Sequence, residues 1–274
     1  MSTLRPYIRM FLGGADLEMA AIRRLAVEVL GAPKVEDKRL AWGAKASAYE
    51  AEIRAALERG ETAVLVELAY DLPPDLPRGR LVEIDHHGAR AGKDAASSLR
   101  QTFDLLGLPP QRWTRELELI EANDIGHIRG LRQAGATATE IVAIRNEDRS
   151  AQGMTPDVEA LSRDAVRRAV RQSRLTIVQT SAPTASAIGD FIQPEFGGPG
   201  ADNLLVLMPA TVSFFGMGRV VSALADVEGS WHGGALPETG FWGVAIPPGR
   251  ARDALAARIE TLLNESATEN NRAP

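Results

Sequence analysis

The sequence predicts an α/β protein: a doubly wound parallel sheet in the N-terminal part, followed by a smaller C-terminal α/β domain. Short apolar segments alternate with segments of helical periodicity, which is the pattern of parallel strands connected by helices. The segment 62–68, Thr-Ala-Val-Leu-Val-Glu-Leu, is almost wholly apolar and rich in strand-forming residues. Such a run is typical of a strand buried on both faces.

In the first half we expect strands at residues 7–12, 62–68 and 80–83, in the order β-α-α-β-β-α. Glycines at 13 and 14 end the first strand, and a helix follows over 17–30. Gly31 and Pro33 stop this helix, and Gly60 ends the next one, expected over 44–59. Further helices are expected at 96–106, 114–121, 128–133 and 139–147.

In the second half a polar stretch at 147–155 leads into a charged helix at 156–174, which we interpret as a connector. Strands are expected at 175–179, 203–208 and 244–246, and helices near 219–225 and 250–263. We therefore predict a first domain over 1–150, a connector over 151–174, a second domain over 175–264, and a flexible polar tail over 265–274.

The composition excludes several classes of protein. The net charge is -5, with 36 acidic and 31 basic residues, which argues against a dedicated binder of duplex DNA. The chain has no cysteine, so any metal must be held by histidine and carboxylates, which suit manganese, magnesium or iron. No apolar run is long enough to span a membrane. We expect a cytoplasmic protein without a membrane partner, and a homodimer is compatible with the sequence.

The most informative motif is Asp85-His86-His87, which directly follows the predicted strand at 80–83. The chain has only four histidines, so two adjacent ones at a strand end point to a function. Ligands of parallel α/β sheets bind at the carboxyl ends of the strands. Three further acidic residues also follow or end predicted strands: Asp16, Glu67 and Asp71.

These segments resemble the DHH phosphoesterases, which are named for the Asp-His-His triplet. The first motif of that family, His-x-x-x-Asp-x-Asp, matches residues 12–18 at Asp16, with Glu18 in place of the second Asp and Leu12 in place of the His. The second-motif Asp corresponds to either Glu67 or Asp71. The fourth motif, Asp-Thr-Gly, is similar to the segment 120–126, where Asp124 is the matching residue.

The second half resembles the DHHA1 domain that accompanies many DHH proteins. The similar segments are 212–216, 218–224, 229–234 and 239–243. The resemblance implies that the substrate is bound by Arg219 and by the loop that carries His232, Gly233 and Gly234. Three nearby aromatic residues fit either core packing or a platform for stacking bases: Trp231, Phe241 and Trp242.

The resemblance implies a phosphoesterase that uses one or two Mn²⁺ (or Mg²⁺) ions. Its substrate would be a small phosphate ester, a short oligonucleotide or a cyclic dinucleotide, bound in a cleft between the domains. Asp85 would orient His86, and His87 would face the scissile phosphate. The implied metal ligands are Asp16, Glu18, Glu67 or Asp71, His86 and Asp124.

Other interpretations remain open. Leu12 removes a nitrogen ligand, which favours a catalytically impaired nucleotide-binding or sensor protein on the same fold. Alternatively, the acidic residues are structural, with Asp16 as an N-cap, and the protein binds another small molecule. We expect His127 to be a surface or helix-start residue. The polar segment 145–149 either lines the cleft or forms a salt-bridge cluster in a loop.

Overall fold

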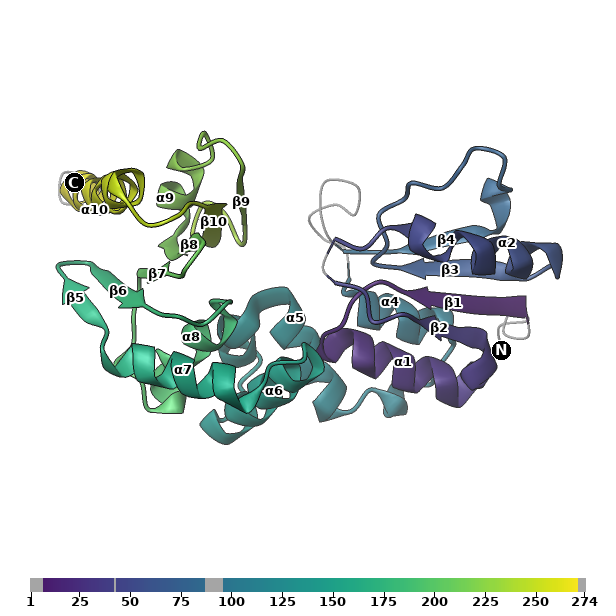
Figure 1. Cartoon of the computed structure of the whole chain (residues 1–274). Helices are drawn as coiled ribbons and strands as arrows, with labels where there is room; N and C mark the ends of the chain where they lie inside the picture. Colours follow the sequence, from purple (N-terminus) through teal and green to yellow (C-terminus); the bar gives the residue numbers. More distant parts are fainter. Residues whose placement is uncertain (1–6, 42, 87–95, 271–274) are drawn as a thin grey trace. The chain divides into compact units, whose positions relative to one another are not determined.

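The computed structural model describes residues 7–41, 43–86 and 96–270, with the backbone alone for 266–270. The chain forms two compact units, Met1–Gly153 and Met154–Pro274, called here the first and the second unit (Figure 1). None of the helices in the described ranges is long and apolar enough to cross a membrane.

The described part of the first unit contains a four-stranded parallel sheet in the order β2-β1-β3-β4. Its strands are β1 (Ile8–Leu12), β2 (Val35–Asp37), β3 (Thr62–Val66) and β4 (Leu81–Ile84). The chain winds from β1 to β2 in one direction and from β1 to β3 and β4 in the other. The predicted fold class, a doubly wound parallel sheet with a second α/β domain, is confirmed. The short strand β2 was not predicted, because two of its three residues are acidic.

Helices cover both faces of this sheet, which explains why its central strands are apolar throughout. On one face α1 (Leu17–Leu30) packs against α4 (Ser98–Leu105), α5 (Arg115–Gln133) and α6 (Ala138–Ala151). On the other face lies α2 (Glu50–Glu58), after a 3-10 turn at Ala46–Tyr49. There Tyr49 and Ile53 form a core with Phe11 of β1 and Leu65 of β3.

The described part of the second unit contains a six-stranded mixed sheet in the order β5-β6-β7-β8-β10-β9. Of the strands described in this sheet, only β6 and β7 pair in parallel. The strands are β5 (Val170–Gln172), β6 (Leu175–Gln179), β7 (Leu204–Leu207), β8 (Thr211–Met217), β9 (Ser230–Gly233) and β10 (Thr239–Ala245). The helices are α7 (Pro156–Arg167), α8 (Ser186–Phe191), α9 (Gly218–Ala223) and α10 (Arg250–Asn270).

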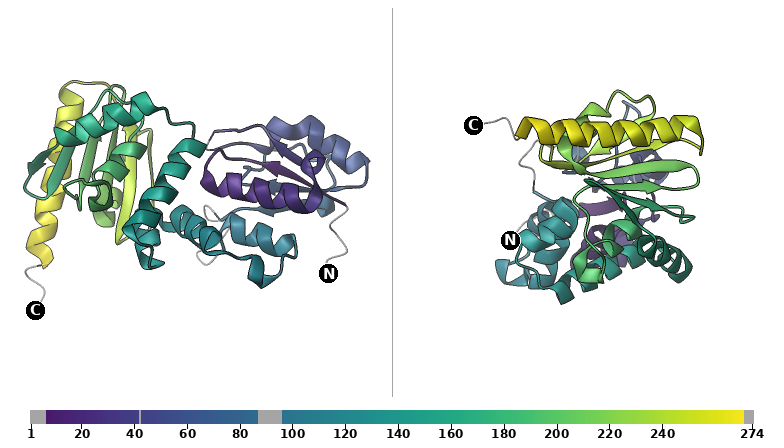
Figure 2. Two further views of the ribbon diagram at one scale, coloured as in Figure 1. Left: turned by 90° about the horizontal axis from the view of Figure 1, so that it is seen from below. Right: turned by 90° about the vertical axis from the view of Figure 1, so that its left-hand side faces the viewer.

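Each face of the second sheet carries its own core. Phe214 and Trp242 pack with Val221 of α9 and Ile259 of α10, and Figure 2 shows α10 in yellow along this face. The other core joins α7 and α8 to β6 and β7. Trp242 is therefore a core residue, and its Nε1–H donates to the Leu224 carbonyl at 2.9 Å. Trp231 and Phe241 remain 42% and 40% exposed.

Several predicted elements differ from the structure. The charged helix expected to reach residue 174 ends at Arg167, because residues 170–172 form β5 and pair with β6. The helices expected at 114–121 and 128–133 are one element, α5, with a kink at His127. The helix α6 continues to Ala151, because polar residues of its last turns are buried rather than solvated.

A buried carboxylate joins the starts of three strands. Glu61, directly before β3, accepts hydrogen bonds from Nε of Arg9 at 2.9 Å and Nη2 of Arg59 at 3.1 Å. It also pairs with Lys34, directly before β2. Burial would raise the pKa of Glu61, but the hydrogen bonds from Lys34, Arg9 and Arg59 outweigh it and lower the pKa to about 2.

The substitution Glu61→Gln is expected to lower the free energy of unfolding at pH 7 by about 2 kcal/mol, because Arg9, Lys34 and Arg59 lose a buried charged acceptor. Since the pKa of Glu61 is lower in the folded protein, its contribution is complete above about pH 4.5 and is lost as the pH falls to about 2. Urea unfolding at several pH values measures this. A difference between the two proteins that stays constant down to pH 2 would contradict the assignment.

Candidate metal centre

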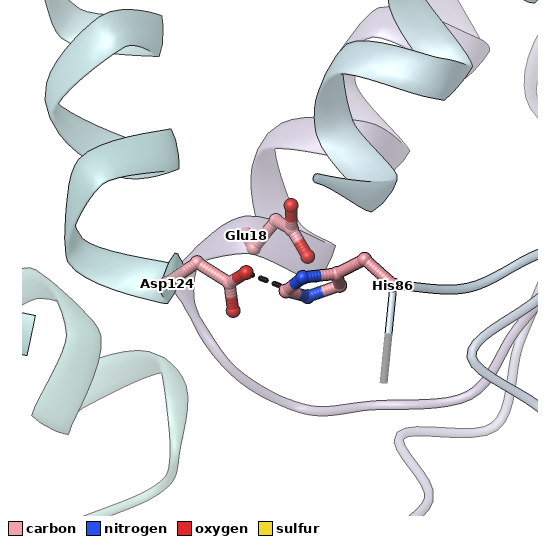
Figure 3. Close-up of side chains that lie close together, drawn as sticks. All are labelled: Glu18, His86 and Asp124. Atoms are coloured by element: carbon pink, nitrogen blue, oxygen red, sulfur yellow. Dashed lines mark ion pairs between the residues drawn. The ribbon is translucent and has the colours of Figure 1, made fainter. Parts of the chain in front are cut away.

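Four side chains from four elements meet at the carboxyl end of the parallel sheet. Glu18 comes from the first turn of α1, Glu67 follows β3, His86 follows β4, and Asp124 belongs to α5. The Nε2 atom of His86 lies 2.8 Å from Oδ2 of Asp124 and 3.4 Å from Oε1 of Glu67. Glu18, His86 and Asp124 each offer one ligand atom, and these atoms lie within 4.8 Å of one another (Figure 3).

The backbone of Glu67 is held from two sides. Its N–H donates to the Ile84 carbonyl at 2.8 Å, which extends the pairing of β3 with β4 by one residue. Its φ of 51° lies in the left-handed region, which is uncommon for a residue other than glycine. A Cβ atom at Gly13 would lie 2.2 Å from the Glu67 carbonyl oxygen, so the loop after β1 requires glycine there.

The first turn of α1 carries two of the predicted ligands. Asp16 is the N-cap of this helix, and its Oδ1 accepts the N–H of Met19 at 2.8 Å. Glu18 is buried, and its Oε1 accepts the N–H of Leu99 in the first turn of α4 at 2.8 Å. Glu18 is thereby fixed by the helix that follows β4 in the sequence.

A kink in α5 accompanies Asp124. His127 has a φ of 51° and a ψ of -146°, which interrupts the helical backbone three residues after Asp124. A Cβ atom at Gly130 would lie 2.1 Å from the Ala122 carbonyl oxygen, so the two halves of the helix approach each other where only glycine fits. The kink and Asp124 are therefore parts of one local structure.

The charges of the cluster act strongly on each other. Burial raises the pKa of Glu18 well above its usual range, and the negative charges of Asp124 and Glu67 add to this. Burial, with the same two carboxylates, also raises the pKa of Asp16 to about 6, against the hydrogen bond from Met19. For His86, burial would lower the pKa, but Asp124 and Glu67 raise it to about 10. The cluster therefore favours any bound cation.

The residues present fit a divalent ion. Carboxylate oxygens with one imidazole nitrogen, and no thiolate, form a donor set that suits manganese, magnesium or iron. Several carboxylates gathered at a buried position are costly unless a cation compensates them. Glu18, His86 and Asp124 would hold the ion, with Glu67 beside His86.

The remaining predicted residues of the first unit lie as follows. Asp71 accepts two hydrogen bonds from Ser47, from N–H at 2.8 Å and from Oγ at 2.6 Å. Of the two candidates for the second motif, Glu67 is thus the one placed beside His86. Asp85 is half-buried, and its carbonyl accepts Nε2–H of Gln101 at 3.0 Å. His87 lies outside the described residues.

The predicted substrate-binding residues belong to the second unit. Arg219 lies in α9, with its Nε 2.9 Å from the sulfur of Met217. His232 and Gly233 lie in β9 at the edge of the sheet. Gly234 follows with a φ of +112°, and a Cβ atom there would lie 2.6 Å from the Cα of Gly240. Glycine is therefore required at position 234 by the backbone.

Three residues beside the centre were not among the predicted site residues: Asn123, Arg145 and Asp148. The segment 145–149 was expected either to line a cleft or to form a loop cluster, but it lies on α6, where Arg145 and Asp148 are 2% and 4% exposed. Their spacing of three residues places both on one helix face. The sequence contains no signal that this charged face is buried.

Comparisons with known proteins add distant structural likenesses. The sequence matches no family model and no curated protein. The pGpG-specific phosphodiesterase PggH from Vibrio cholerae is 10% identical, covers 93% of this chain and 99% of its own, and gives a TM-score of 0.44. RecJ with Mn²⁺ from Thermus thermophilus is 15% identical, with 96% and 53% covered and a TM-score of 0.48. This chain spans about half the length of that RecJ.

A further structure, an exonuclease RecJ bound to manganese, is 15% identical, covers 99% of this chain and 92% of its own, and gives a TM-score of 0.42. Likenesses this distant assign no activity.

The substitution Gly130→Ala is expected to lower the free energy of unfolding by about 1–3 kcal/mol, because the added methyl group overlaps the Ala122 carbonyl. It should also weaken metal binding, since Asp124 lies two residues beyond Ala122. Gly126→Ala is the matched control, because no atom lies within 4 Å of its Cβ position, and a change within about 1 kcal/mol is expected. Equal effects of both substitutions on melting temperature would contradict this description of the kink.

The substitution Glu18→Gln separates metal binding from folding. Because the pKa of Glu18 is raised, glutamine resembles the protonated acid and keeps an oxygen for the Leu99 N–H. The melting temperature of chelator-treated protein should change by less than that of Glu61→Gln, whereas its rise on adding Mn²⁺ should be lost. A variant that retains the full Mn²⁺-induced rise would exclude Glu18 as a ligand.

Proposed function

We propose that this chain is a divalent-metal-dependent phosphoesterase that uses Mn²⁺ or Mg²⁺. The observation that carries the proposal is the convergence of Glu18, Glu67 and Asp124 on His86 at the carboxyl end of a parallel sheet. Ligand sites of such sheets lie at this edge. Carboxylates at this position supply the negative charge that a divalent ion requires.

Hydrolysis of a phosphate ester requires neutralisation of its negative charge and an activated water molecule. A bound divalent ion neutralises phosphoryl oxygens and lowers the pKa of a bound water, which supplies a nucleophile near neutral pH. The chain's own part is to hold the ligands in place: Leu99 fixes Glu18, and the paired strands β3 and β4 fix Glu67 and His86. We propose that Asp85 and His87 assist at His86 and at the phosphate, as the triplet resemblance implies.

The first motif bears on the number of ions that the centre can hold. Leu12 stands where the resembling family has a histidine, and its side chain is fully buried in the core. Its carbonyl accepts the Tyr49 hydroxyl at 2.7 Å, so this position serves the packing of β1 against α2. Among the described residues one group of metal ligands is present, which supports a single ion at Glu18, His86 and Asp124. We propose Asp16 as an additional ligand through its second carboxylate oxygen.

As substrate we propose a small phosphate ester or a short or cyclic nucleotide. The net charge of -5 disfavours a long polyanion, whose binding depends on a basic surface. In the second unit we propose Arg219, His232, Gly233 and Gly234 as substrate contacts, on the resemblance of their segments. Arginine binds phosphate in a bidentate manner, and backbone N–H groups beside glycines can approach it closely.

A second function is a nucleotide-binding or sensor protein that binds a metal without turnover. The specific observation in its favour is Leu12, because a core leucine cannot replace a nitrogen ligand. Both functions require the metal centre and differ only in hydrolysis, so one experiment separates them.

Chelator-treated protein is expected to hydrolyse bis-p-nitrophenyl phosphate or a member of a short-oligonucleotide panel after Mn²⁺ or Mg²⁺ is added. His86→Ala and Asp124→Ala should each lose about 100-fold or more of this activity, because a lost ligand costs at least as much as a lost partner of a ligand. The control Asp75→Ala removes a surface carboxylate that pairs with Arg54, and should keep wild-type activity.

Two other results would decide against hydrolysis. A Mn²⁺-induced rise in melting temperature that His86→Ala abolishes, without turnover of any panel member, favours the sensor. The absence of any stabilisation by Mn²⁺ or Mg²⁺ would contradict the metal centre in both functions.

A further inference from the structure

A buried polar network on α6 connects two of the elements that carry candidate metal ligands. Arg145 and Asp148 of α6 are 2% and 4% exposed, and Asn123 of α5 is 7% exposed. Burying two charged side chains is costly, and their mutual attraction offsets the cost only with good geometry and additional hydrogen bonds. This network has short contacts between the charged groups and additional hydrogen bonds.

The first contact reaches α1. Oδ1 of Asp148 accepts the backbone N–H of Leu17 at 3.1 Å, in the buried interior. Leu17 is the first residue of α1, and its N–H has no partner within the helix. Its two neighbours in the sequence are Asp16 and Glu18. The bond from Asp148 therefore holds the backbone between two candidate ligands.

The second contact reaches α5. Nη1 of Arg145 donates to Oδ2 of Asp148 at 2.6 Å and to Oδ1 of Asn123 at 2.9 Å. Asn123 directly precedes Asp124, whose carboxylate lies 2.8 Å from His86. Nε2 of Gln152 also donates to Oδ2 of Asp148, at 3.0 Å. Both oxygens of Asp148 are thus engaged, one toward α1 and the other toward α5.

Both contacts end one residue away from a candidate ligand. Metal ions tolerate only a few tenths of an ångström of error in the distances to their ligands. Glu18 and Asp124 come from different helices, so their separation depends on whatever joins the two helices near the site. The path from Leu17 through Asp148 and Arg145 to Asn123 is such a connection, and it contains no exposed residue.

We propose that Asp148, acting through Arg145, is a positioning residue of the metal centre: it sets the distance between Glu18 and Asp124. The inference rests on the proposed function in one respect, that an ion binds at this centre. It assigns to α6 a role in metal affinity and not only in stability.

The test is the Mn²⁺ dissociation constant of the full chain, measured by calorimetric titration well below the unfolding temperature. Asp148→Asn keeps the size of the side chain and an oxygen for Leu17, but removes the charge that holds Arg145. Asn123→Ala cuts the contact to α5 and leaves the acceptor of Leu17 in place. Each should weaken Mn²⁺ binding by about 10-fold or more, as expected when a partner that orients a ligand is lost.

The matched control is Glu61→Gln. It also removes a buried carboxylate that is hydrogen-bonded to arginine. Glu61 directly precedes β3, however, whereas the metal centre lies at the carboxyl end of the parallel sheet. It should lower the melting temperature without changing the Mn²⁺ dissociation constant. If Asp148 only stabilised the fold, Asp148→Asn would behave like this control. A positioning role is therefore recognised by a changed Mn²⁺ dissociation constant and not by a lowered melting temperature.

Each outcome has one meaning. If wild type binds Mn²⁺ and both Asp148→Asn and Asn123→Ala bind it equally well, the positioning role is overturned while the proposed function stands. If Glu61→Gln weakens binding as much as they do, the effect comes from stability and the role is again overturned. If wild type does not bind Mn²⁺, the proposed function fails, and the inference with it. If Asp148→Asn does not fold, Asn123→Ala decides alone.

Discussion

The first unit depends on one constraint. The carboxylates of Glu18, Glu67 and Asp124 are held around the imidazole of His86 at a position that is largely shielded from solvent. Carboxylates in a protein interior repel one another, so unrestrained side chains move apart or become protonated. Here the surrounding backbone prevents separation. The paired ends of β3 and β4, the Leu99 N–H and the kink in α5 each restrict one side chain. Burial, together with the neighbouring charges of Asp124 and Glu67, therefore raises the pKa of Glu18 well above its usual range.

The pKa values of carboxylates are shifted in opposite directions at the two ends of the parallel strands. Around Glu61, basic side chains lower the pKa to about 2, and the ion pairs are complete within the chain. Around Asp16, burial and neighbouring carboxylates raise the pKa to about 6. The first arrangement satisfies its own charge and the second does not. This contrast is the one expected between a carboxylate that stabilises the fold and one that we propose as a metal ligand.

The sequence predicts much of this, and its omissions have physical causes. The strand β1 is apolar and the helix α1 has 14 residues with helical periodicity, so both are recognisable. By contrast, β2 has three residues and β9 carries glycine at its end. The choice between Glu67 and Asp71 needed the position of Ser47, which spacing cannot reveal. Arg145 and Asp148 were expected in a cleft or a loop cluster, because their burial depends on the packing of α6 against α1 and α5. The fold class can be predicted from periodicity. Hydrogen bonds between residues far apart in the sequence, such as that between Leu17 and Asp148, cannot.

The sequence separations within the centre bear on how the protein is made. Glu18 is bonded to a residue 81 positions later in the chain, and Leu17 to one 131 positions later. Domains generally form as units while the chain is synthesised from its N-terminus. A nascent chain that ends before α6 contains every candidate ligand of the first unit but lacks the acceptor for Leu17. The order of synthesis therefore places the completion of the centre at the end of the first unit, after the ligands themselves have been made.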